Sequence, residues 1–376
     1  MILLGLLAIP ILIGLGAMIL GKGKFTWKEF LVQEVVLLVV IGGGYGASVL
    51  AARWGAASDV EIWNGKVARK DKGTHGCCHD YPCNPHPCNC DTNGDCDTCW
   101  DTCYEHSHDV YWDAKSTNGE TVYSNRCNAP GTSTPRRWAQ IQIGEPTAVE
   151  HSYQNYIKAN PDTVLRRQGA AEKFRGLLPA YPRVYDHYRI RQFLFVKIKV
   201  DPSALKFMNE VLMEMNGDLG ARKQLNIIFV VARTDDPSYA EALREHWIGG
   251  KKNDLVVVMG AKEYPKLDFV EVVTWSRSEE MKLAIRDRIM ETEEFGHEKV
   301  FSIVREEAGK KFVRQEMAEY EYLMSSVEPP TWAIVLNFVV GLIASVGLAI
   351  YFWLKDPFGD RRRYGYGFHR SRDWNY

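Results

Sequence analysis

Long apolar stretches interrupt an otherwise mixed sequence, and the clearest of them is residues 331–354. It contains no charged side chain, and at about 1.5 Å per residue a helix of this length crosses a hydrocarbon core of about 30 Å. Trp332 lies at its start and Tyr351 and Trp353 lie at its end, where amphipathic rings prefer the level of the lipid headgroups. The alternative is a buried core helix, but the length and the aromatic flanks favour a transmembrane helix.

Two further apolar stretches, residues 1–21 and 31–52, predict two more transmembrane helices. The first has no basic start and no small-residue cleavage site, so we favour a retained helix over a cleaved signal peptide. The second carries Glu34 near its start and a glycine-rich run at residues 42–46. Because small residues let helix backbones approach closely, we expect this face to pack on another span.

Positive charges flank the apolar stretches in residues 22–30 and in the tail at residues 355–376. They are Lys22, Lys24, Lys28, Lys355, Arg361, Arg362, Arg363, Arg370 and Arg372. Because cytoplasmic loops carry the excess of lysine and arginine, both segments are predicted to be cytoplasmic. Residues 53–329 are then extracytoplasmic or periplasmic. The lipid bilayer is the first predicted partner, and anionic lipid is the simplest ligand of the tail.

Residues 53–150 change to short runs of alternating apolar and polar side chains, which are typical of β-strands. Four strands are predicted, at residues 60–69, 109–115, 120–125 and 137–146. Asn118 and Gly119 lie between the second and the third of them and predict a tight hairpin. Residues 151–191 have the composition of an irregular, partly helical connector.

Residues 192–296 alternate between strand and helix patterns, which predicts an α/β layer with a largely parallel sheet. The predicted strands are 192–200, 225–232, 254–259 and 269–275, and the predicted helices are 203–216, 238–247 and 279–290. Asp201, Asp236 and Ser278 precede the three helices and are residue types that cap helix starts. Residues 297–329 carry apolar side chains at helical spacing as far as Ser325 and predict one long amphipathic helix. The predicted fold class is a multi-domain α+β membrane protein.

All nine cysteines lie within residues 77–127. They are Cys77, Cys78, Cys83, Cys88, Cys90, Cys96, Cys99, Cys103 and Cys127, and they are interleaved with His75, His79, His86, His106 and His108. This segment forms an insertion between two predicted strands with almost no apolar core, so covalent or metal cross-links must stabilise it. Disulfides are favoured because the predicted compartment is oxidising, whereas zinc at the Cys-x-x-Cys pair Cys96 and Cys99 is the competing hypothesis. The odd number leaves one thiol free, bonded to another chain, or used on a metal.

Oxygen-bearing side chains alternate within the cysteine-rich segment, as they do in calcium-binding loops. They are Asp91, Asn93, Asp95 and Asp97. The glycine usual at the sixth position of such a loop is Cys96, and no glutamate follows at the twelfth. A solvated turn inside a cross-linked loop is therefore the alternative to a calcium site, and the histidines are interpreted as surface groups.

The segment AEALREHWIGGKKNDLVVVMG resembles the TPM domain family, whose members occur among thylakoid and photosystem-repair proteins. The resemblance covers about residues 192–290 and rests on Trp247, Gly249, Asn253 and Asp254, followed by an apolar strand. It implies an extracytoplasmic α/β domain next to a membrane span, and some relatives bind calcium or act as acid phosphatases. Leu255 replaces the usual glycine, and the later glycine-tyrosine-glycine element is absent. The resemblance therefore implies fold and placement rather than activity.

Paired carboxylates follow the predicted strand 225–232, where ligands of open α/β sheets often bind. Asp235 and Asp236 lie there in the sequence, and we expect the connector that ends at Asp254 to lie near them. Such a group would hold a divalent cation or supply an acid and a base, whereas the alternative role for Asp236 is helix capping. The sequence contains no Walker loop, no Gly-x-Ser-x-Gly and no His-Glu-x-x-His motif.

The net charge of -1 argues against a nucleic-acid-binding protein. We therefore expect a non-enzymatic membrane protein whose disulfide-stapled region assembles with itself or with a membrane or virion complex. The alternative is a cation-binding or phosphatase-like domain anchored to the membrane. The layout of two spans, a cysteine-rich domain, an α/β domain and a third span also resembles membrane proteins of large tailed phages.

Overall fold

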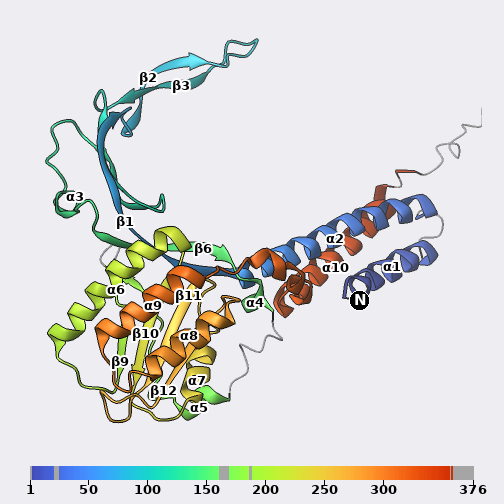
Figure 1. Cartoon of the computed structure of the whole chain (residues 1–376). Coiled ribbons are helices and arrows are strands. Elements are labelled where there is room, and N and C mark those ends of the chain that lie inside the picture. The colour runs from blue at the N-terminus through green and yellow to red at the C-terminus, as the bar shows by residue number, and fades with distance from the viewer. Residues whose placement is uncertain (1, 21–24, 161–168, 186–188, 356, 359–376) are drawn as a thin grey trace, which may run out of the picture. The chain divides into compact units, whose positions relative to one another are not determined.

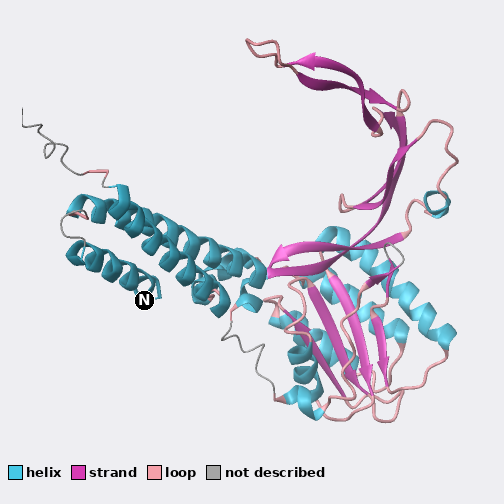
Figure 2. Ribbon diagram, turned by 180° about the vertical axis from the view of Figure 1, so that it is seen from behind, coloured by secondary structure: helices cyan, strands magenta, loops and turns pink. Residues whose placement is uncertain are grey.

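The computed structural model describes residues 2–20, 25–160, 169–185, 189–355 and 357–358. The chain divides into two compact units, one formed by Met1–Ala57 with Tyr322–Tyr376 and the other by Ser58–Glu321. Figure 1 and Figure 2 show the helices and strands of each unit. Lys22, Lys24 and the arginines of the predicted basic tail lie outside the described residues.

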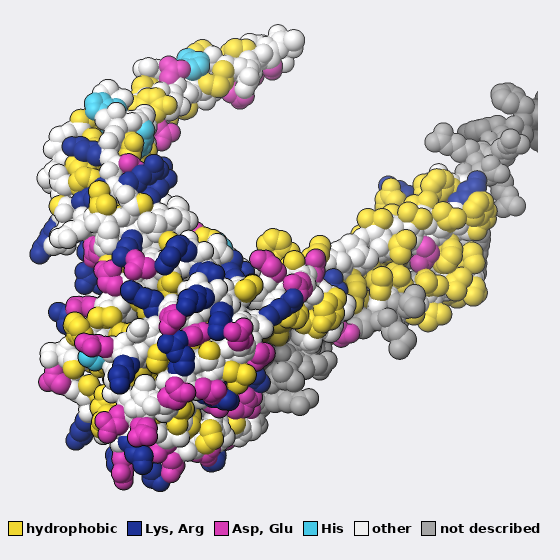
Figure 3. All heavy atoms as spheres, viewed as in Figure 1, with side chains coloured by type: hydrophobic (Ala, Val, Ile, Leu, Met, Phe, Trp, Pro, Cys, Tyr) yellow, Lys and Arg dark blue, Asp and Glu magenta, His cyan; other side chains and the backbone are white. Residues whose placement is uncertain are grey.

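The described residues of the first unit form three α-helices, α1 (Ile2–Leu20), α2 (Trp27–Ala57) and α10 (Thr331–Lys355). Two of them, α2 and α10, are long and apolar enough to cross a membrane, with mean hydropathies of 2.1 and 2.5. Only 11% and 22% of their apolar windows are buried, unlike a core helix of a soluble protein, which is mostly buried. Apolar side chains cover these helices in Figure 3. The predicted third span, α1, is helical but does not meet the same length and hydropathy criterion over the described residues.

Polar side chains connect α2 to α10 within an otherwise apolar contact. Asn337 donates from Nδ2 to the carbonyl oxygen of Ile41 at 3.0 Å, and Gln33 donates from Nε2 to the hydroxyl of Ser345 at 3.2 Å. A Cβ atom added to Gly44 would lie 2.6 Å from the Oδ1 atom of Asn337. The predicted packing of the glycine-rich face on another span is therefore confirmed at Gly44.

The second unit begins with a four-stranded antiparallel sheet in the order β5-β4-β1-β6. Its strands are β1 (Ser58–His75), β4 (Asp109–Ser116), β5 (Thr121–Asn128) and β6 (Pro146–Gln154). The long strand β1 changes partner along its length: its first half pairs with β6, and its second half pairs with β4. The Asn118-Gly119 hairpin is confirmed, because the N–H of Gly119 donates to the oxygen of Ser116 and Gly119 has a φ of 88°.

The predicted strand at residues 137–146 is wrong. Its first part is the short helix α3 (Arg136–Gln140), and the strand in this region is β6, which starts at Pro146. Trp138 explains the difference, because its indole packs edge-on against Trp112 and donates to the backbone oxygen of Asp113 at 2.9 Å. Tertiary contacts of this one side chain override the alternating pattern.

The cysteine-rich insertion folds as a two-stranded hairpin made of β2 (Asp80–Cys88) and β3 (Asp97–Tyr104). No residue of either strand is buried. The hairpin therefore lacks an apolar core, as the sequence predicts, and covalent bonds must stabilise it.

The α/β part is a sheet in the order β12-β11-β10-β9, in which β9, β10 and β11 are parallel and β12 is antiparallel. The strands are β9 (Phe193–Val196), β10 (Asn226–Ala232), β11 (Asp254–Gly260) and β12 (Phe269–Thr274). The helices are α6 (Pro202–Lys223), α7 (Ser238–His246), α8 (Glu279–Met290) and α9 (His297–Lys311). Alternate residues of β10 and β11 pack against α6, α8 and α9 on one face and against α7 on the other. The prediction of a largely parallel α/β layer is confirmed.

The predicted helix caps are also present. The carboxylate of Asp201 accepts from the N–H groups of Ser203 and Ala204, and the hydroxyl of Ser278 accepts from the N–H of Met281. Asp236 accepts from the N–H of Ser238 at 2.9 Å, which supports the capping role.

The single amphipathic helix predicted for residues 297–329 is wrong. Helix α9 ends at Lys311, an extended segment follows, and residues Met317–Ser326 form a 3-10 helix. Phe312 is extended and buried in the α/β core, and the N–H of Val313 donates to the hydroxyl of Ser276 at 3.2 Å. Burying Phe312 in this extended conformation interrupts the helical hydrogen bonds.

The connector predicted at residues 151–191 begins inside β6 and contains only short elements beyond it. They are α4 (Tyr156–Ala159), α5 (Ala170–Lys173), β7 (Val184–Tyr185) and β8 (Arg189–Ile190). The antiparallel sheet and the α/β layers belong to one compact unit, although the sequence suggests two domains.

Candidate functional site

Eight of the nine cysteines are paired in disulfides. The pairs are Cys78–Cys127, Cys83–Cys103, Cys88–Cys99 and Cys90–Cys96. Cys96 and Cys99, the competing zinc pair, are bonded to Cys90 and Cys88 in this structure, which favours the disulfide interpretation. Cys77 is the free thiol.

The free thiol lies at a joint between two β-ladders. The β1–β4 ladder ends at the pair His75 and Asp109, and the β2–β3 ladder begins at the pair Asp80 and Tyr104. The two short linkers between these ladders, residues 76–79 and 105–108, therefore run beside each other (Figure 1). A backbone hydrogen bond of 3.1 Å from Glu105 to His79 connects them.

Four ligand-type side chains converge at this joint: Cys77, His79, His106 and Asp109, here called the joint cluster. One ligand atom from each lies within 4.8 Å of all the others. Asp109 Oδ1 lies 2.5 Å from His106 Nε2, and Asp109 Oδ2 lies 3.6 Å from His79 Nδ1. Among the described residues, His79 Nδ1 is a buried nitrogen with no hydrogen-bond partner.

Asp109 is fully buried and its side chain is held in place. The N–H of Cys78 donates to its Oδ2 atom at 2.6 Å. Burial alone raises the pKa of Asp109, but the hydrogen bonds from Cys78 and His106 and the nearby imidazoles outweigh burial and lower it. The cluster thus contains a carboxylate that is ionised at neutral pH.

A hollow of about 720 Å³ opens at the joint cluster and is lined by Cys77, His106 and the rings of Tyr81 and Tyr104. An ion or a small reagent can therefore reach the thiol. Sequence reasoning treated His79 and His106 as surface groups and did not select Asp109. The available signal was the odd cysteine, together with histidines at both ends of the disulfide-rich insertion.

The predicted calcium loop forms a turn. Asp91 Oδ1 accepts from the backbone N–H groups of Asn93 and Asp95, each at 2.9 Å. Asp91, Asn93, Asp95 and Asp97 are all exposed. This geometry is the solvated turn of the alternative interpretation, and calcium there stays a prediction.

The predicted grouping of Asp235 with Asp254 is wrong. In the register of the parallel strands, Asp254 lies beside Asn226 at the start of β10, whereas Asp235 follows the end of β10. Seven residues of strand separate the two positions, which corresponds to roughly 20 Å. Asp235 is exposed and pairs with Lys262 at 2.6 Å, so the two carboxylates do not share one cation.

The four residues that carry the family resemblance lie together at the start of β11 or just before it. Asn253 donates from Nδ2 to the oxygen of Ile62 in β1 at 2.7 Å, and Trp247 donates from Nε1 to the oxygen of Pro179 at 2.8 Å. Gly249 has a φ of 80°, and its carbonyl oxygen accepts from the indole of Trp275 at 2.5 Å. These residues attach the loop before β11 to neighbouring segments.

Asp254 is completely buried in this region. Its carboxyl group accepts from Tyr181 at 3.0 Å, from Asn226 at 2.7 Å and from the N–H of Lys251 at 2.7 Å. Burial raises the pKa of Asp254 to about 6 although these hydrogen bonds act to lower it. Burial and the neighbouring carboxyl group likewise raise the pKa of Tyr181. These three donors hold the carboxyl group in one position, which fits a structural acceptor.

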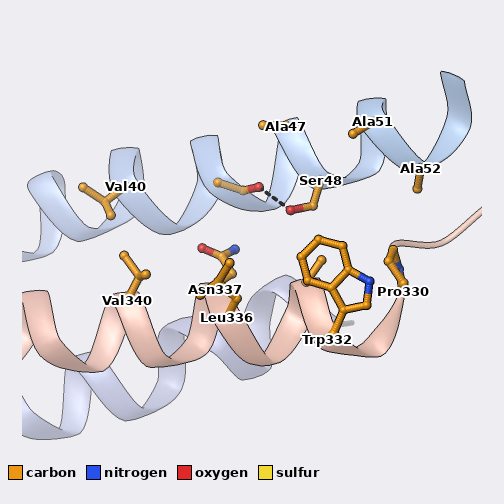
Figure 4. A pocket seen from close by; sticks show the side chains of 12 residues that line it. Val40, Ala47, Ser48, Ala51, Ala52, Pro330, Trp332, Leu336, Asn337 and Val340 are labelled. Carbon is orange, nitrogen blue, oxygen red and sulfur yellow. Dashed lines mark hydrogen bonds between the residues drawn. The ribbon is translucent and has the colours of Figure 1, made fainter. Parts of the chain in front are cut away.

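A groove of about 560 Å³ lies between α2 and α10 in the first unit. Figure 4 shows Trp332 of α10 near Ser48 of α2, and Ala47 and Leu336 also line the groove. The hydroxyl of Ser48 donates to the backbone oxygen of Gly44 at 2.9 Å, so the polar atom is satisfied within its own helix. The groove therefore presents an almost wholly apolar surface.

Comparisons with known proteins give no significant match: no family model, no curated protein sequence and no solved structure matches the chain. The functional interpretation therefore depends on the residues and the geometry described above.

Proposed function

We propose that this chain is a non-enzymatic membrane protein whose disulfide-stapled region lies outside the cytoplasm and assembles into a complex with further copies of the chain. The observation that carries the proposal is the pairing of two apolar, largely unburied helices with a separate unit that contains four disulfides. Lipid covers exposed apolar helices, and an oxidising compartment maintains disulfides.

The arrangement of the first unit supports anchoring by a small helical bundle. Leu6 of α1 packs with Leu37 and Ile41 of α2, and partly buried residues of α10 complete the same cluster. At 19 residues, α1 is roughly 28 Å long, so it would serve as the third span proposed from the sequence. Its role in the membrane is part of the proposal.

Self-assembly is supported by the groove between α2 and α10. The small side chains of Ala47 and Ala51 project little from α2 at the groove. Trp332 and Leu336 line the groove from α10. Small residues let a further helix approach closely, so an apolar helix of a second copy would fill this surface. The exposed β2–β3 hairpin offers a second surface for contact outside the membrane.

The resemblance to the TPM family remains a proposal about fold and placement. The α/β layers, and the apolar helix α10 that follows them along the chain, are compatible with it. The separation of Asp235 from Asp254 removes the two-carboxylate site on which the cation-binding or phosphatase-like alternative depended. We therefore propose no enzymatic activity for the α/β part.

Orientation is tested by labelling intact cells or sealed vesicles with a membrane-impermeant amine reagent, followed by peptide mapping. Lysines of the second unit, such as Lys206 and Lys262, are expected to react, whereas Lys355, the one lysine in residues 355–376, is expected to be protected. The reverse labelling pattern would refute the extracytoplasmic placement.

Self-assembly is tested by oxidative cross-linking of a cysteine placed at Ala47, in a Cys77→Ser background, in native membranes. Ala47→Cys is expected to give a cross-linked dimer. The matched control is Val49→Cys, which lies about 200° around the same helix from position 47 and is expected to cross-link much less. A protein that stays monomeric with both variants, and with a lysine cross-linker, contradicts the assembly proposal.

A further inference from the structure

The joint cluster differs from the other groups of polar residues in the second unit because two imidazoles, a thiol and a buried carboxylate point to one place. We propose that Cys77, His79, His106 and Asp109 bind one divalent transition-metal ion of the zinc type, with Cys77 as a thiolate. This inference goes beyond the proposed function and does not depend on it, because the site would bind metal in either compartment.

The set of donors selects the class of ion. One sulfur, two imidazole nitrogens and one carboxylate oxygen give four ligands, which is the number that zinc takes in tetrahedral sites. Thiolate and imidazole disfavour calcium and magnesium, which bind oxygen ligands. All four donor atoms already lie within 4.8 Å of one another, so small rotations of the side chains suffice to close the site around an ion.

The surrounding hydrogen bonds orient the ligands in the way that metal sites require. The N–H of His79 donates to the sulfur of Cys77 at 3.4 Å, which holds the sulfur in position. The N–H of Cys78 holds Asp109 Oδ2 at 2.6 Å. The Cys78–Cys127 disulfide attaches the linker that contains Cys77 to strand β5. Hydrogen bonds of this kind orient metal ligands and raise their affinity for the ion.

The protons balance simply. In the metal-free protein a proton on His106 Nε2 bridges to Asp109 Oδ1. A bound ion takes the place of that proton on Nε2, and the single proton of the neutral imidazole moves to Nδ1, so His106 releases none. The thiol of Cys77 loses its proton to solvent, so binding one divalent ion releases one proton and involves no oxidation.

A catalytic thiol is the main alternative role for these residues. A cysteine, histidine and carboxylate triad needs one imidazole between the other two groups. Here the carboxylate of Asp109 is close to both His79 and His106, and His79 Nδ1 has no hydrogen-bond partner. Because both imidazole rings lie next to the carboxylate of Asp109, the arrangement fits an ion bound at the centre better than a catalytic triad.

The position of the cluster suggests what the ion does. His79 and Cys77 come from the linker before β2, whereas His106 and Asp109 come from the linker after β3 and the first residue of β4. An ion shared by both linkers would fix the direction of the β2–β3 hairpin relative to the β1–β4 ladder. Metal binding would therefore make the hairpin more rigid without changing its disulfides.

The test uses the full chain purified in detergent under non-reducing conditions and titrated with Co²⁺ as a spectroscopic substitute for Zn²⁺. We expect one Co²⁺ per chain, with tetrahedral ligand-field bands and sulfur-to-cobalt charge-transfer absorption, displaced by Zn²⁺. Cys77→Ser should abolish the charge-transfer absorption. His79→Ala and His106→Ala should each weaken binding by at least about 100-fold, because even changes to outer-shell partners cost 10–100-fold.

The matched controls are His86→Ala and His108→Ala, which remove histidines of the same segment that lie outside the joint cluster and should leave binding unchanged. Disulfide mapping of each variant verifies that the four pairs are retained. The unmodified protein supplies a readout that needs no variant: Zn²⁺ should protect Cys77 from alkylation by a neutral thiol reagent. Absence of protection, unchanged Co²⁺ binding by Cys77→Ser, or Cys77 in a disulfide between chains would each overturn the proposal.

Discussion

The side-chain nitrogen of Lys251 lies 2.5 Å from a carboxylate oxygen of Asp59. The contact joins β1 of the antiparallel sheet to the loop before β11 of the α/β layers, 192 residues further along the chain. Lys158 binds the same carboxylate at 3.0 Å, and Asp59 is 6% exposed. Burial acts to raise the pKa of Asp59, but the two lysines and Asn155 outweigh it and lower the pKa. Asp59 is therefore a buried, ionised junction between the two sheets.

We expect Asp59→Ala to destabilise the protein by roughly 3 kcal/mol, because removing one member of a buried ion pair leaves the other charges uncompensated. Thermal unfolding of the detergent-solubilised protein, followed by tryptophan fluorescence, measures the change. The control is Lys206→Met, which removes an exposed pair with Glu210 and should change stability by less than about 1 kcal/mol. Equal effects of the two variants would contradict the assigned role of Asp59.

Because of Asp254, the free energy of unfolding should decrease as the pH rises from about 4 to about 6. Burial raises its pKa to about 6 from an ordinary value of 3.8, so in this window the folded protein holds a proton that the unfolded chain has lost. About two pKa units correspond to about 3 kcal/mol, and above pH 6 the contribution is constant. The contribution of Asp59 to stability depends on pH in the opposite direction, because its pKa is lowered. This contribution is lost only as the pH falls below about 4.

The measurement is the free energy of unfolding between pH 4 and pH 7 for the native protein and for Asp254→Asn. The variant should be less stable at pH 4, because its amide nitrogen faces groups that donate hydrogen bonds to Asp254. Its free energy of unfolding should also change less with pH. Parallel slopes for the two proteins would show that Asp254 does not titrate in this range.

Loss of disulfides should unfold the β2–β3 hairpin and leave the α/β layers intact. The hairpin has no buried residues, so the Cys83–Cys103 and Cys88–Cys99 bonds supply its stability, at about 3 kcal/mol for a loop of 15 residues. Cleavage by chymotrypsin after Trp100 and Tyr104 should become faster in the Cys88→Ser, Cys99→Ser double variant.

Cleavage at buried sites of the α/β sheet, such as Phe229, serves as the internal control and should not change. Mass spectrometry of the fragments assigns each cut. A hairpin that remains as resistant to chymotrypsin after the Cys88–Cys99 bond is removed would contradict the inference that its disulfides supply its stability.

The contact between α2 and α10 should depend on which glycine of α2 is enlarged. A Cβ atom at Gly44 meets Asn337 at 2.6 Å, whereas one at Gly43 meets nothing within 4 Å. Gly44→Leu should therefore displace Asn337 from the oxygen of Ile41 and cost about 1–3 kcal/mol through overpacking. Gly43→Leu should cost no more than about 1 kcal/mol, as expected for an exposed helix position.

Thermal melting in detergent, followed by circular dichroism, compares the two glycine variants in the same preparation. Asn337→Leu, which removes the hydrogen bond without adding a side chain on α2, gives the separate contribution of the polar contact. A larger loss for Gly43→Leu than for Gly44→Leu would mean that α2 presents another face to α10.

Local patterns predicted the elements whose structure depends on local chemistry. The apolar stretch at residues 331–354 forms α10, and Ser278 caps the start of α8. The continuous apolar run at residues 225–232 contains a strand that is buried on both faces. Where a long-range contact decided the conformation, the prediction was wrong. Trp138 packs on Trp112, and the segment around it is a short helix where a strand was predicted. Phe312 is buried in an extended conformation, so helix α9 ends at Lys311 although the apolar pattern continues.

By itself, the sequence determined that this protein combines apolar helices with a cross-linked cysteine-rich insertion and an α/β layer, because hydrophobic period, capping residues and cysteine content act over a few residues. Only the tertiary structure decided which thiol is free, that Asp235 and Asp254 lie at opposite ends of the sheet, and that Cys77, His79, His106 and Asp109 meet. Cysteine pairing and strand register bring together residues far apart in the chain. No local pattern encodes those distances.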